Sequence, residues 1–222
     1  MTHPIRREVD ETDRLLALSD GVIAIVITLL VLDLTVPSVP RDEQLVLLPT
    51  AIAEQWPEFL GFVLSFLVVG FYWVLHRRTF VHIERHDRGV VCLNLCFLLL
   101  VAFVPYATSV FTTYPGRFGT PFLSVVLALT SCSLAALWIY ADRREVLDAG
   151  LRSRTVQIQA ARFLASPSVF ALAAIVGRYR PLLGMVAWLL LLPINGALQS
   201  RLLAGLDRYS RSANCQPKMT IV

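Results

Sequence analysis

Six long apolar stretches constrain the fold of this chain more than any other feature. A helix needs about 20 mostly apolar residues to cross a bilayer. The stretches cover residues 15–36, 59–75, 89–111, 121–140, 160–176 and 181–198. They show no alternation of polar and apolar residues, so they predict helices and not the strands of a β-barrel. We therefore predict an all-α integral membrane protein with six transmembrane helices.

The overall composition supports a membrane protein and argues against a soluble one. Hydrophobic residues make up 56% of the 222 residues and charged residues 16%, whereas soluble domains carry about 25% charged residues. A single soluble core of this size cannot bury the excess. The basic residues flank apolar runs instead of forming a stripe, so no nucleic-acid partner is expected. No catalytic pair, phosphate-binding loop or metal-ligand set is visible, and we predict neither an enzyme nor a cofactor nor a bound metal.

The loop charges indicate how the chain is oriented. With the N-terminus in the cytoplasm, the cytoplasmic loops and ends hold all but four of the 20 basic residues, the exceptions being Arg41, Arg117, Arg178 and Arg180. Cytoplasmic loops are enriched in arginine and lysine, so we predict that both termini are cytoplasmic. Because nearly every basic residue is arginine, we also expect a GC-rich bacterial source and hence a multi-pass protein of the bacterial cell membrane.

The predicted organisation has one membrane domain with two polar ends. Residues 1–14 form the cytoplasmic N-terminus, residues 15–200 the six-helix transmembrane domain, and residues 201–222 a partly disordered cytoplasmic tail. The short apolar segment 45–54 cannot cross a bilayer, and we expect it to form a helix on the outer surface. The fifth stretch is the weakest because Pro167 interrupts it, and Pro105 predicts a kink in the third.

An aspartate inside the first stretch is the most unusual residue in the chain. An aspartate at this depth costs about 3 kcal/mol on insertion scales, so Asp20 indicates a buried polar network or an ion path. Helical geometry places an apolar stripe about 140° away from it. That stripe consists of Leu18, Gly21, Ile25, Thr28, Leu29 and Leu32. Asp20 should therefore face neighbouring helices, while the stripe faces lipid or a partner helix.

Polar residues in the second and third stretches are candidate partners of Asp20. Trp73 and His76 lie three residues apart on one helix face and could donate hydrogen bonds to Asp20. Alternatively, Tyr72 and Trp73 simply belong to an aromatic belt at the interface. Asn94 could cap a helix, form a hydrogen bond between helices, or face a water path.

Two motifs in the first half of the chain resemble those of a known family. Arg14-x-x-x-Leu18-Ser19-Asp20-Gly21 resembles the first-helix signature of the transmembrane protein 175 family, in which an aromatic residue stands where Leu18 stands here. The sequence Tyr72-Trp73-x-x-His76 with Phe80 after it is similar to the second-helix motif, although Arg77 replaces a second histidine of some relatives. The resemblance covers roughly residues 10–110. The family comprises potassium channels of endosomes and lysosomes, with shorter prokaryotic homologues.

The resemblance implies a homotetramer whose first helices line a central pore for potassium ions within the membrane lipid. By position, Ile25 matches the family's hydrophobic constriction, Thr28 a threonine layer proposed to assist selectivity, and Leu29 and Leu32 the continuation of the pore face. Arg14, Ser19 and Asp20 match the motif that ties the pore helix to its neighbours. Trp73 and His76 are then the expected partners of that motif.

Two other functions remain open at this stage. A secondary transporter or proton pathway would use Asp20 and His76 as a relay across the inner half of the membrane. A membrane scaffold would carry no flux and would use Ile25 only for packing.

Overall fold

The fold consists of long helices packed side by side along a common direction. The computed structural model describes residues 4–83, 87–147 and 153–189, without the side chains of 4–12, 153–164 and 189. No β-strand occurs in these ranges, where one isolated bridge joins Ile83 to Leu147. The helices are α1 (Pro4–Leu29), η1 (Leu30–Asp33), η2 (Arg41–Glu43), α2 (Gln44–Glu54), α3 (Trp56–Val81), α4 (Arg88–Thr113), α5 (Gly119–Arg143), α6 (Ser153–Tyr179) and α7 (Pro181–Leu189).

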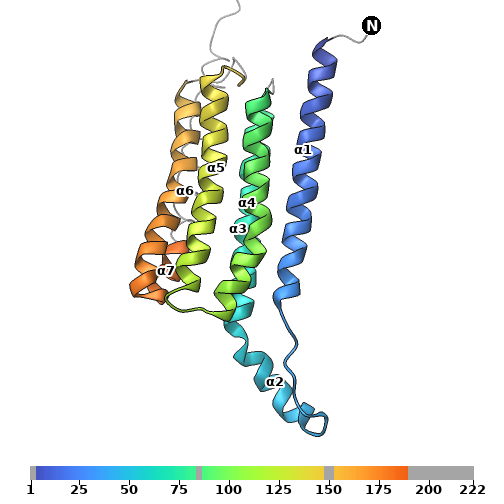
Figure 1. The fold of residues 1–222 in the computed structure, drawn as a ribbon, viewed down its shortest axis with the longest axis vertical. Helices are drawn as coiled ribbons and strands as arrows, with labels where there is room; N and C mark the ends of the chain where they lie inside the picture. The colour runs from blue at the N-terminus through green and yellow to red at the C-terminus, as the bar shows by residue number, and fades with distance from the viewer. Residues whose placement is uncertain (1–3, 84–86, 148–152, 190–222) are drawn as a thin grey trace, which may run out of the picture.

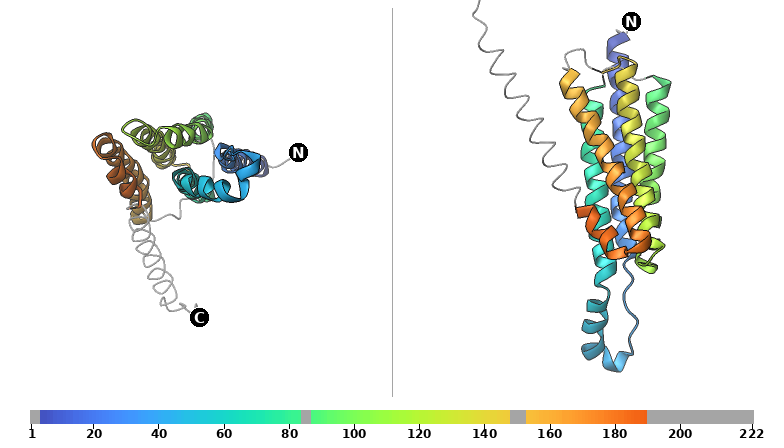
Figure 2. Two further views of the ribbon diagram at one scale, coloured as in Figure 1. Left: turned by 90° about the horizontal axis from the view of Figure 1, so that it is seen from below. Right: turned by 90° about the vertical axis from the view of Figure 1, so that its left-hand side faces the viewer.

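Helix α1 lies at one side of the bundle. It packs against α3 and α4, whereas α4 packs against α5, α5 against α6, and α6 against α7. Figure 2 shows this order from the end, with α1 and α6 on opposite sides. One face of α1 is therefore covered by its own chain, and the opposite face is not.

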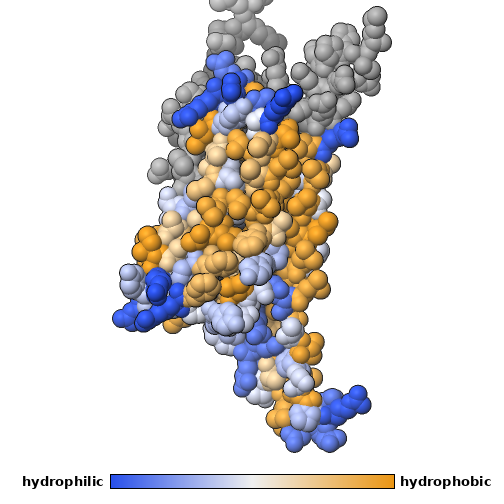
Figure 3. Space-filling model, in the orientation of Figure 1, coloured by the Kyte–Doolittle hydropathy of each residue, from blue (hydrophilic) through white to orange (hydrophobic). Residues whose placement is uncertain are grey.

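Four helical segments are long and apolar enough to cross a membrane, within the part of the chain that the structure describes. They are Asp13–Asp33, Trp56–Val81, Arg88–Thr113 and Gly119–Arg143. The apolar side chains form a broad band across the middle of the face drawn in Figure 3, and charged residues gather at both ends. That distribution is the one expected when the long axis of the bundle crosses a bilayer.

The four segments match the first four predicted spans, extended by a few residues at most ends. The fifth predicted span falls within α6, which is continuous through Pro167, and α6 is not among the four. Of the sixth, α7 covers residues 181–189, and residues 190–198 lie outside the described residues, as does the tail 201–222. The all-α class is confirmed, whereas the count of six and the cytoplasmic termini stay predictions.

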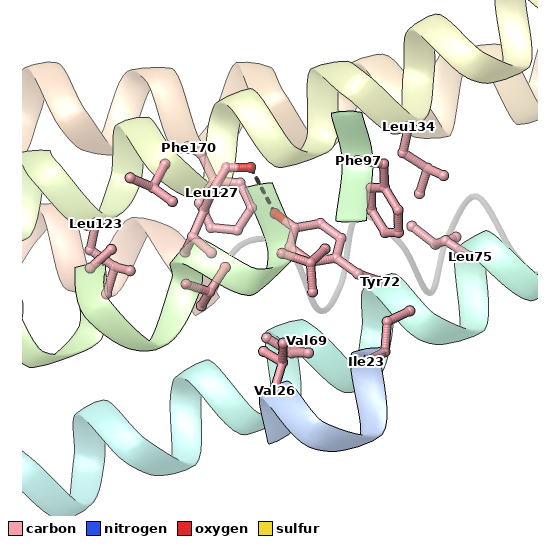
Figure 4. Close-up of a cluster of buried hydrophobic side chains, with 14 of the residues drawn as sticks. Ile23, Val26, Val69, Tyr72, Leu75, Phe97, Leu123, Leu127, Leu134 and Phe170 are labelled. Atoms are coloured by element: carbon pink, nitrogen blue, oxygen red, sulfur yellow. Dashed lines mark hydrogen bonds between the residues drawn. The ribbon is translucent and has the colours of Figure 1, made fainter. Parts of the chain in front are cut away.

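The helices are joined by a buried core that mixes aliphatic and aromatic side chains. Tyr72 on α3 lies at its centre, where its hydroxyl donates to the Leu127 carbonyl at 2.7 Å and lies 2.9 Å from the Ser131 hydroxyl. Figure 4 shows the ring among aliphatic side chains of α1, α3 and α5. A second pair, Ser65 and Thr108, joins α3 to α4 by hydroxyls 2.8 Å apart. These hydrogen bonds fix the pairing of helices that apolar packing alone would leave free to slide.

The segment between the first two spans forms the short helix predicted for residues 45–54. Helix α2 projects beyond the end of the bundle, below α3 (Figure 1). None of its side chains is buried, although most of them are apolar, and Leu45 is almost wholly exposed. Gln55, just after α2, donates through Nε2 to the carbonyl of Thr35 at 2.9 Å and thereby ties the start of α3 to the segment that follows η1.

Candidate functional site: the two faces of helix α1

The covered face of α1 repeats at helical spacing. Ser19, Ile23 and Val26, followed by Leu30 at the start of η1, are each at most 2% exposed, at intervals of four, three and four residues. Such spacing keeps them in one stripe, which lies against α3 and α4. The polar member of this stripe, Ser19, is at the end nearest the predicted cytoplasmic side.

Asp20 lies at the edge of this covered face and accepts a hydrogen bond from α3. The indole Nε1 of Trp73 donates to its Oδ1 at 2.7 Å. The bond is charge-assisted when the carboxylate is ionised, which makes it stronger than a neutral one. Asp20 and Trp73 are both half-buried, so the aspartate keeps contact with the surroundings of the bundle. The guanidinium of Arg77, one turn further along α3, lies 5.7 Å from the Trp73 ring centre.

A fully buried chain of hydrogen bonds joins α3, α4 and α1 beside this pair. His76 Nε2 lies 2.7 Å from Asn94 Oδ1, and Asn94 Nδ2 donates to the Ser19 hydroxyl at 3.0 Å. Ser19 in turn donates to the carbonyl of Leu15 at 2.9 Å. Since the Ser19 proton is already engaged, Asn94 must donate to Ser19 and accept from His76. His76 is thus the Nε2-protonated tautomer.

The surroundings of His76 are aromatic on both sides. Its ring stacks on Phe97 with centroids 5.1 Å apart and lies 4.5 Å from the ring of Phe80. The other ring nitrogen, Nδ1, has no hydrogen-bond partner in the described part of the chain and is closed off from solvent. The histidine is therefore a buried link between α3 and α4, with none of its surface exposed.

The structure brings together most of the predicted network but changes its connections. Trp73 donates to Asp20 as expected, whereas His76 bonds to Asn94 and not to Asp20. Of the three roles left open for Asn94, the hydrogen bond between helices is the one present. Arg14 is exposed and makes no contact with these groups among the described residues. The sequence identifies Tyr72 only as part of a motif, because a tyrosine in an apolar run gives no sign of which distant hydroxyl it will contact.

The uncovered face of α1 carries the predicted apolar stripe. Ile25 is 60% exposed, and Leu18, Thr28 and Leu29 are exposed as well; Leu32, which continues this face in η1, is 72% exposed. Thr28 turns its hydroxyl back to the Ile25 carbonyl, 2.7 Å away, so its methyl group is left to join the apolar surface. The replacement of the motif's aromatic residue by Leu18 falls on this face and does not touch the buried network.

Metal-binding groups are scarce in the described residues. No group of three or more histidine, cysteine or acidic side chains lies close enough to hold an ion in that part of the chain. Cys92 and Cys96 are free and exposed on α4. Among the described residues, the site therefore consists of a hydrogen-bonded interior and an apolar exterior.

The part of the chain that carries these features is similar to a known family. The family described as "Endosomal/lysosomal potassium channel TMEM175" matches residues 14–105. A potassium channel of Streptomyces collinus is 37% identical over 139 residues, which are 60% of this chain and 66% of that protein. The human endosomal/lysosomal proton channel TMEM175 is 36% identical over 111 residues, 46% of this chain and 22% of the human protein. The matched segment thus spans just under two thirds of the Streptomyces protein and about a fifth of the human one.

A solved structure extends the similarity over most of the chain. The crystal structure of a lysosomal potassium-selective channel TMEM175 homolog from Chamaesiphon minutus superposes with a TM-score of 0.72 at 29% sequence identity, covering 86% of this chain and 98% of that one. These relatives are described as ion channels and not as enzymes. The matched residues include Arg14, Ser19 and Asp20 as well as Trp73, His76 and Asn94. Over residues 14–105, this chain is similar to the TMEM175 family.

Proposed function

We propose that this chain is a subunit of a passive, potassium-permeable ion channel. Four copies surround a central pore that the exposed face of α1 lines. The observation that carries the proposal is the division of α1 into a face bonded to α3 and α4 and a face left uncovered, with Ile25 at its middle. We infer that the ion is potassium because relatives of this chain are described as potassium channels.

The position of α1 supports an assembly of several copies. A pore needs a wall on every side, and α1 lies at the margin of its own bundle with Ile25 and Leu32 exposed (Figure 2). Symmetry-related copies of the same helix would complete the wall, as closed rings of identical subunits do. The number four comes from the family resemblance.

The proposed mechanism follows from a ring of apolar side chains. Four Ile25 side chains would form a narrow dry neck, which excludes water when closed and strips part of the ion's hydration shell when open. Potassium sheds water at a lower free-energy cost than sodium, so the neck favours potassium without a cage of carbonyl groups. Thr28, Leu29 and Leu32 would continue the same surface outward, and the flux would be passive.

The hydrogen bonds argue against a proton relay through Asp20 and His76. The two side chains are not bonded to each other, because Asp20 accepts from Trp73 and His76 bonds to Asn94. An indole N–H only donates and cannot pass a proton on. Phe80 and Phe97 also enclose His76. A coupled transporter that uses this pair is therefore the weaker proposal, although vertebrate relatives are described as proton channels.

We further propose that both termini are cytoplasmic and that the protein resides in a bacterial cell membrane, surrounded by lipid. Support comes from the arginines, which concentrate on one side of the predicted spans. The predicted fifth and sixth spans would return the chain to the side on which it starts.

Ion flux from proteoliposomes of the purified protein tests the channel proposal. We expect potassium gradients to drive unsaturating flux that charges the vesicle at fixed pH. Flux driven only by a pH gradient would favour a coupled transporter, and no flux from folded protein would favour a scaffold.

Substitution of the proposed neck tests the assignment of Ile25. Ile25→Asn should wet the neck and raise sodium permeability relative to potassium by about threefold or more. Ala24→Asn is the matched control, since Ala24 is also exposed on α1 but lies about 100° around the helix. The two ion permeabilities are compared from reversal potentials under mixed potassium and sodium. If Ile25→Asn kept the wild-type ion preference, Ile25 would not be the selectivity filter.

A further inference from the structure

Arg14 lies on the same seam of α1 as the proposed neck. The residues 14, 18, 21, 25, 28 and 32 follow one another at intervals of four, three, four, three and four, which keeps them on one face of the helix. Those from Arg14 to Thr28 are within α1, Leu32 is in η1, and all six are exposed. The family motif suggests that Arg14 belongs with Ser19 and Asp20, but helical geometry puts it about 120–140° around α1 from them.

The two acidic residues of α1 whose side chains the structure describes, Asp13 and Asp20, lie on other faces of the helix than Arg14. Asp20 lies about 120° around the helix from Arg14 and is held by Trp73. Asp13 is exposed and lies about 100° away. In the described part of the chain, the Arg14 guanidinium has no hydrogen-bond or ion-pair partner. Asp10 and Glu11 precede Arg14 by about one turn, but the positions of their side chains lie outside the described residues.

The distance along the helix places Arg14 at the mouth of the pore and not in its neck. Ile25 follows Arg14 by eleven positions, which is about 16 Å at 1.5 Å per residue. Between Arg14 and Ile25, this face carries only Leu18 and Gly21. Gly21 has no side chain, and nothing lies within 4 Å of where its Cβ would stand. A charge at this place can act on ions that enter the pore but does not strip their water.

We propose that four copies of Arg14 form a ring of positive charge at the inner mouth of the pore and reduce the entry of cations from that side. The inference rests on the proposed tetramer with α1 at its axis. The ring lowers the local potassium concentration, so it limits outward current more than inward current. Replacing Arg14 by a neutral residue makes the electrostatic potential at the pore mouth more negative whatever acids surround it, because the contributions of separate charges add.

Coulomb's law sets the size and the salt dependence of the effect. Four unit charges about 10 Å from the axis, in water and screened by salt, change the local cation concentration about sevenfold at 10 mM salt and about two- to threefold at 100 mM. At 1 M salt the screening length is about 3 Å and the effect should vanish. An effect that disappears at high salt is electrostatic, whereas an effect of altered pore structure would remain at high salt.

The test records potassium currents from inside-out patches that contain the full chain. We expect Arg14→Gln to raise the ratio of outward to inward current about two- to threefold in symmetrical 100 mM KCl, more at 10 mM, and not at all at 1 M. Arg88→Gln is the matched control. Arg88 is also exposed, carries the same charge and lies at the corresponding end of α4, away from the α1 seam. An equal change in both variants would overturn the proposal.

A second measurement keeps the test valid if the first variant folds poorly. Arg14→Cys is made in a background in which Cys92, Cys96, Cys132 and Cys215 are replaced by alanine. A positively charged thiol reagent applied from the cytoplasmic side should return the current ratio to that of the wild type, and a negatively charged reagent should move it further away. If neither reagent changes the ratio, Arg14 does not face the pore.

The two proposals fail in different ways. If the wild type carries no potassium current, or if Ile25→Asn leaves ion preference unchanged, the proposed channel is wrong. If potassium current and the effect of Ile25 are both present while Arg14 variants behave as Arg88→Gln does, only the ring is wrong.

Discussion

The two faces of helix α1 differ in composition, in contacts and in what they are free to do. The covered face carries Ser19 within a chain of directional hydrogen bonds to α3 and α4. The exposed face carries Ile25 and Leu32, which contact little of their own chain. One helix can therefore keep a fixed position through one side while the other side meets ions or partner subunits. Changes to the covered face should reduce stability, and changes to the exposed face should alter conduction.

The largest expected loss of stability follows from breaking the buried chain of hydrogen bonds. Asn94→Leu leaves the His76 Nε2–H without an acceptor and removes a donor to Ser19, which should cost about 2–4 kcal/mol. Thermal unfolding in detergent, followed by the loss of soluble folded protein, measures the change. Cys96→Leu is the control because Cys96 is exposed on the same helix, and it should change little. Equal losses in both would mean that the two faces of α4 do not differ in this way.

Trp73→Phe tests the edge between the two faces. The ring remains but the indole donor to Asp20 is lost, so we expect destabilisation by about 1 kcal/mol. Asp20→Asn should cost less, because the amide oxygen can still accept from Trp73.

Potassium flux in the same two variants separates a structural role of Asp20 from a proton relay. We expect folded Asp20→Asn to retain potassium flux. Loss of flux in this variant with normal stability would show that the carboxylate takes part in conduction and would contradict the division between the two faces.

The smallest expected effect lies outside α1, where α4 begins. Tyr140 donates to Asp87 Oδ2 at 2.6 Å, and the backbone of Val90 donates to Oδ1. These bonds, the one from Tyr140 first, lower the pKa of the Asp87 carboxyl below its ordinary range. Gly89 permits the close approach of Tyr140, since a Cβ there would collide with the phenol oxygen.

Tyr140→Phe should therefore lower stability slightly at neutral pH, with a pH dependence of known sign. Because the Asp87 pKa is depressed on folding, its contribution is full above the ordinary aspartate pKa of about 3.9 and is lost as the pH falls through the lower folded value. The wild type and the variant should thus differ at pH 7 and converge below pH 4. Melting temperatures at several pH values measure this, with Tyr106→Phe, an exposed tyrosine of α4, as the control. A difference that grows on acidification would refute the role of Asp87.

The parts of the fold that could be predicted are those that depend on local sequence. Apolar runs longer than a bilayer is thick specify helices regardless of their neighbours, and the period of 3.6 residues separates Asp20 from Ile25 on α1. Helix α2 could be predicted because its apolar segment is too short to cross a bilayer. Pro105 and Pro167 lie inside continuous helices, α4 and α6, and the kink expected at Pro105 stays a prediction. A helix packed on both sides can tolerate the loss of one backbone hydrogen bond.

The connections between helices could be predicted only in part. Trp73 was correctly matched to Asp20 because both lie at the same depth. Depth did not reveal that His76 would prefer Asn94, because several polar groups share that level and the register of three helices decides among them. Arg14 shows the opposite difficulty, since its motif groups it with Ser19 although three helical steps along the exposed face (14, 18, 21, 25) group it with Ile25.

The sequence by itself determined that this chain forms apolar helices, that α1 has a polar edge and an apolar stripe, and that residues 14–105 are similar to the TMEM175 family. Helix geometry and the cost of burying polar groups are local properties, so a sequence contains them directly. Only the tertiary structure decided that Asn94 bridges His76 to Ser19 and that Arg14 remains outside the network. These pairings depend on the rotation and height of α1, α3 and α4 relative to one another, which the packing of the whole core sets.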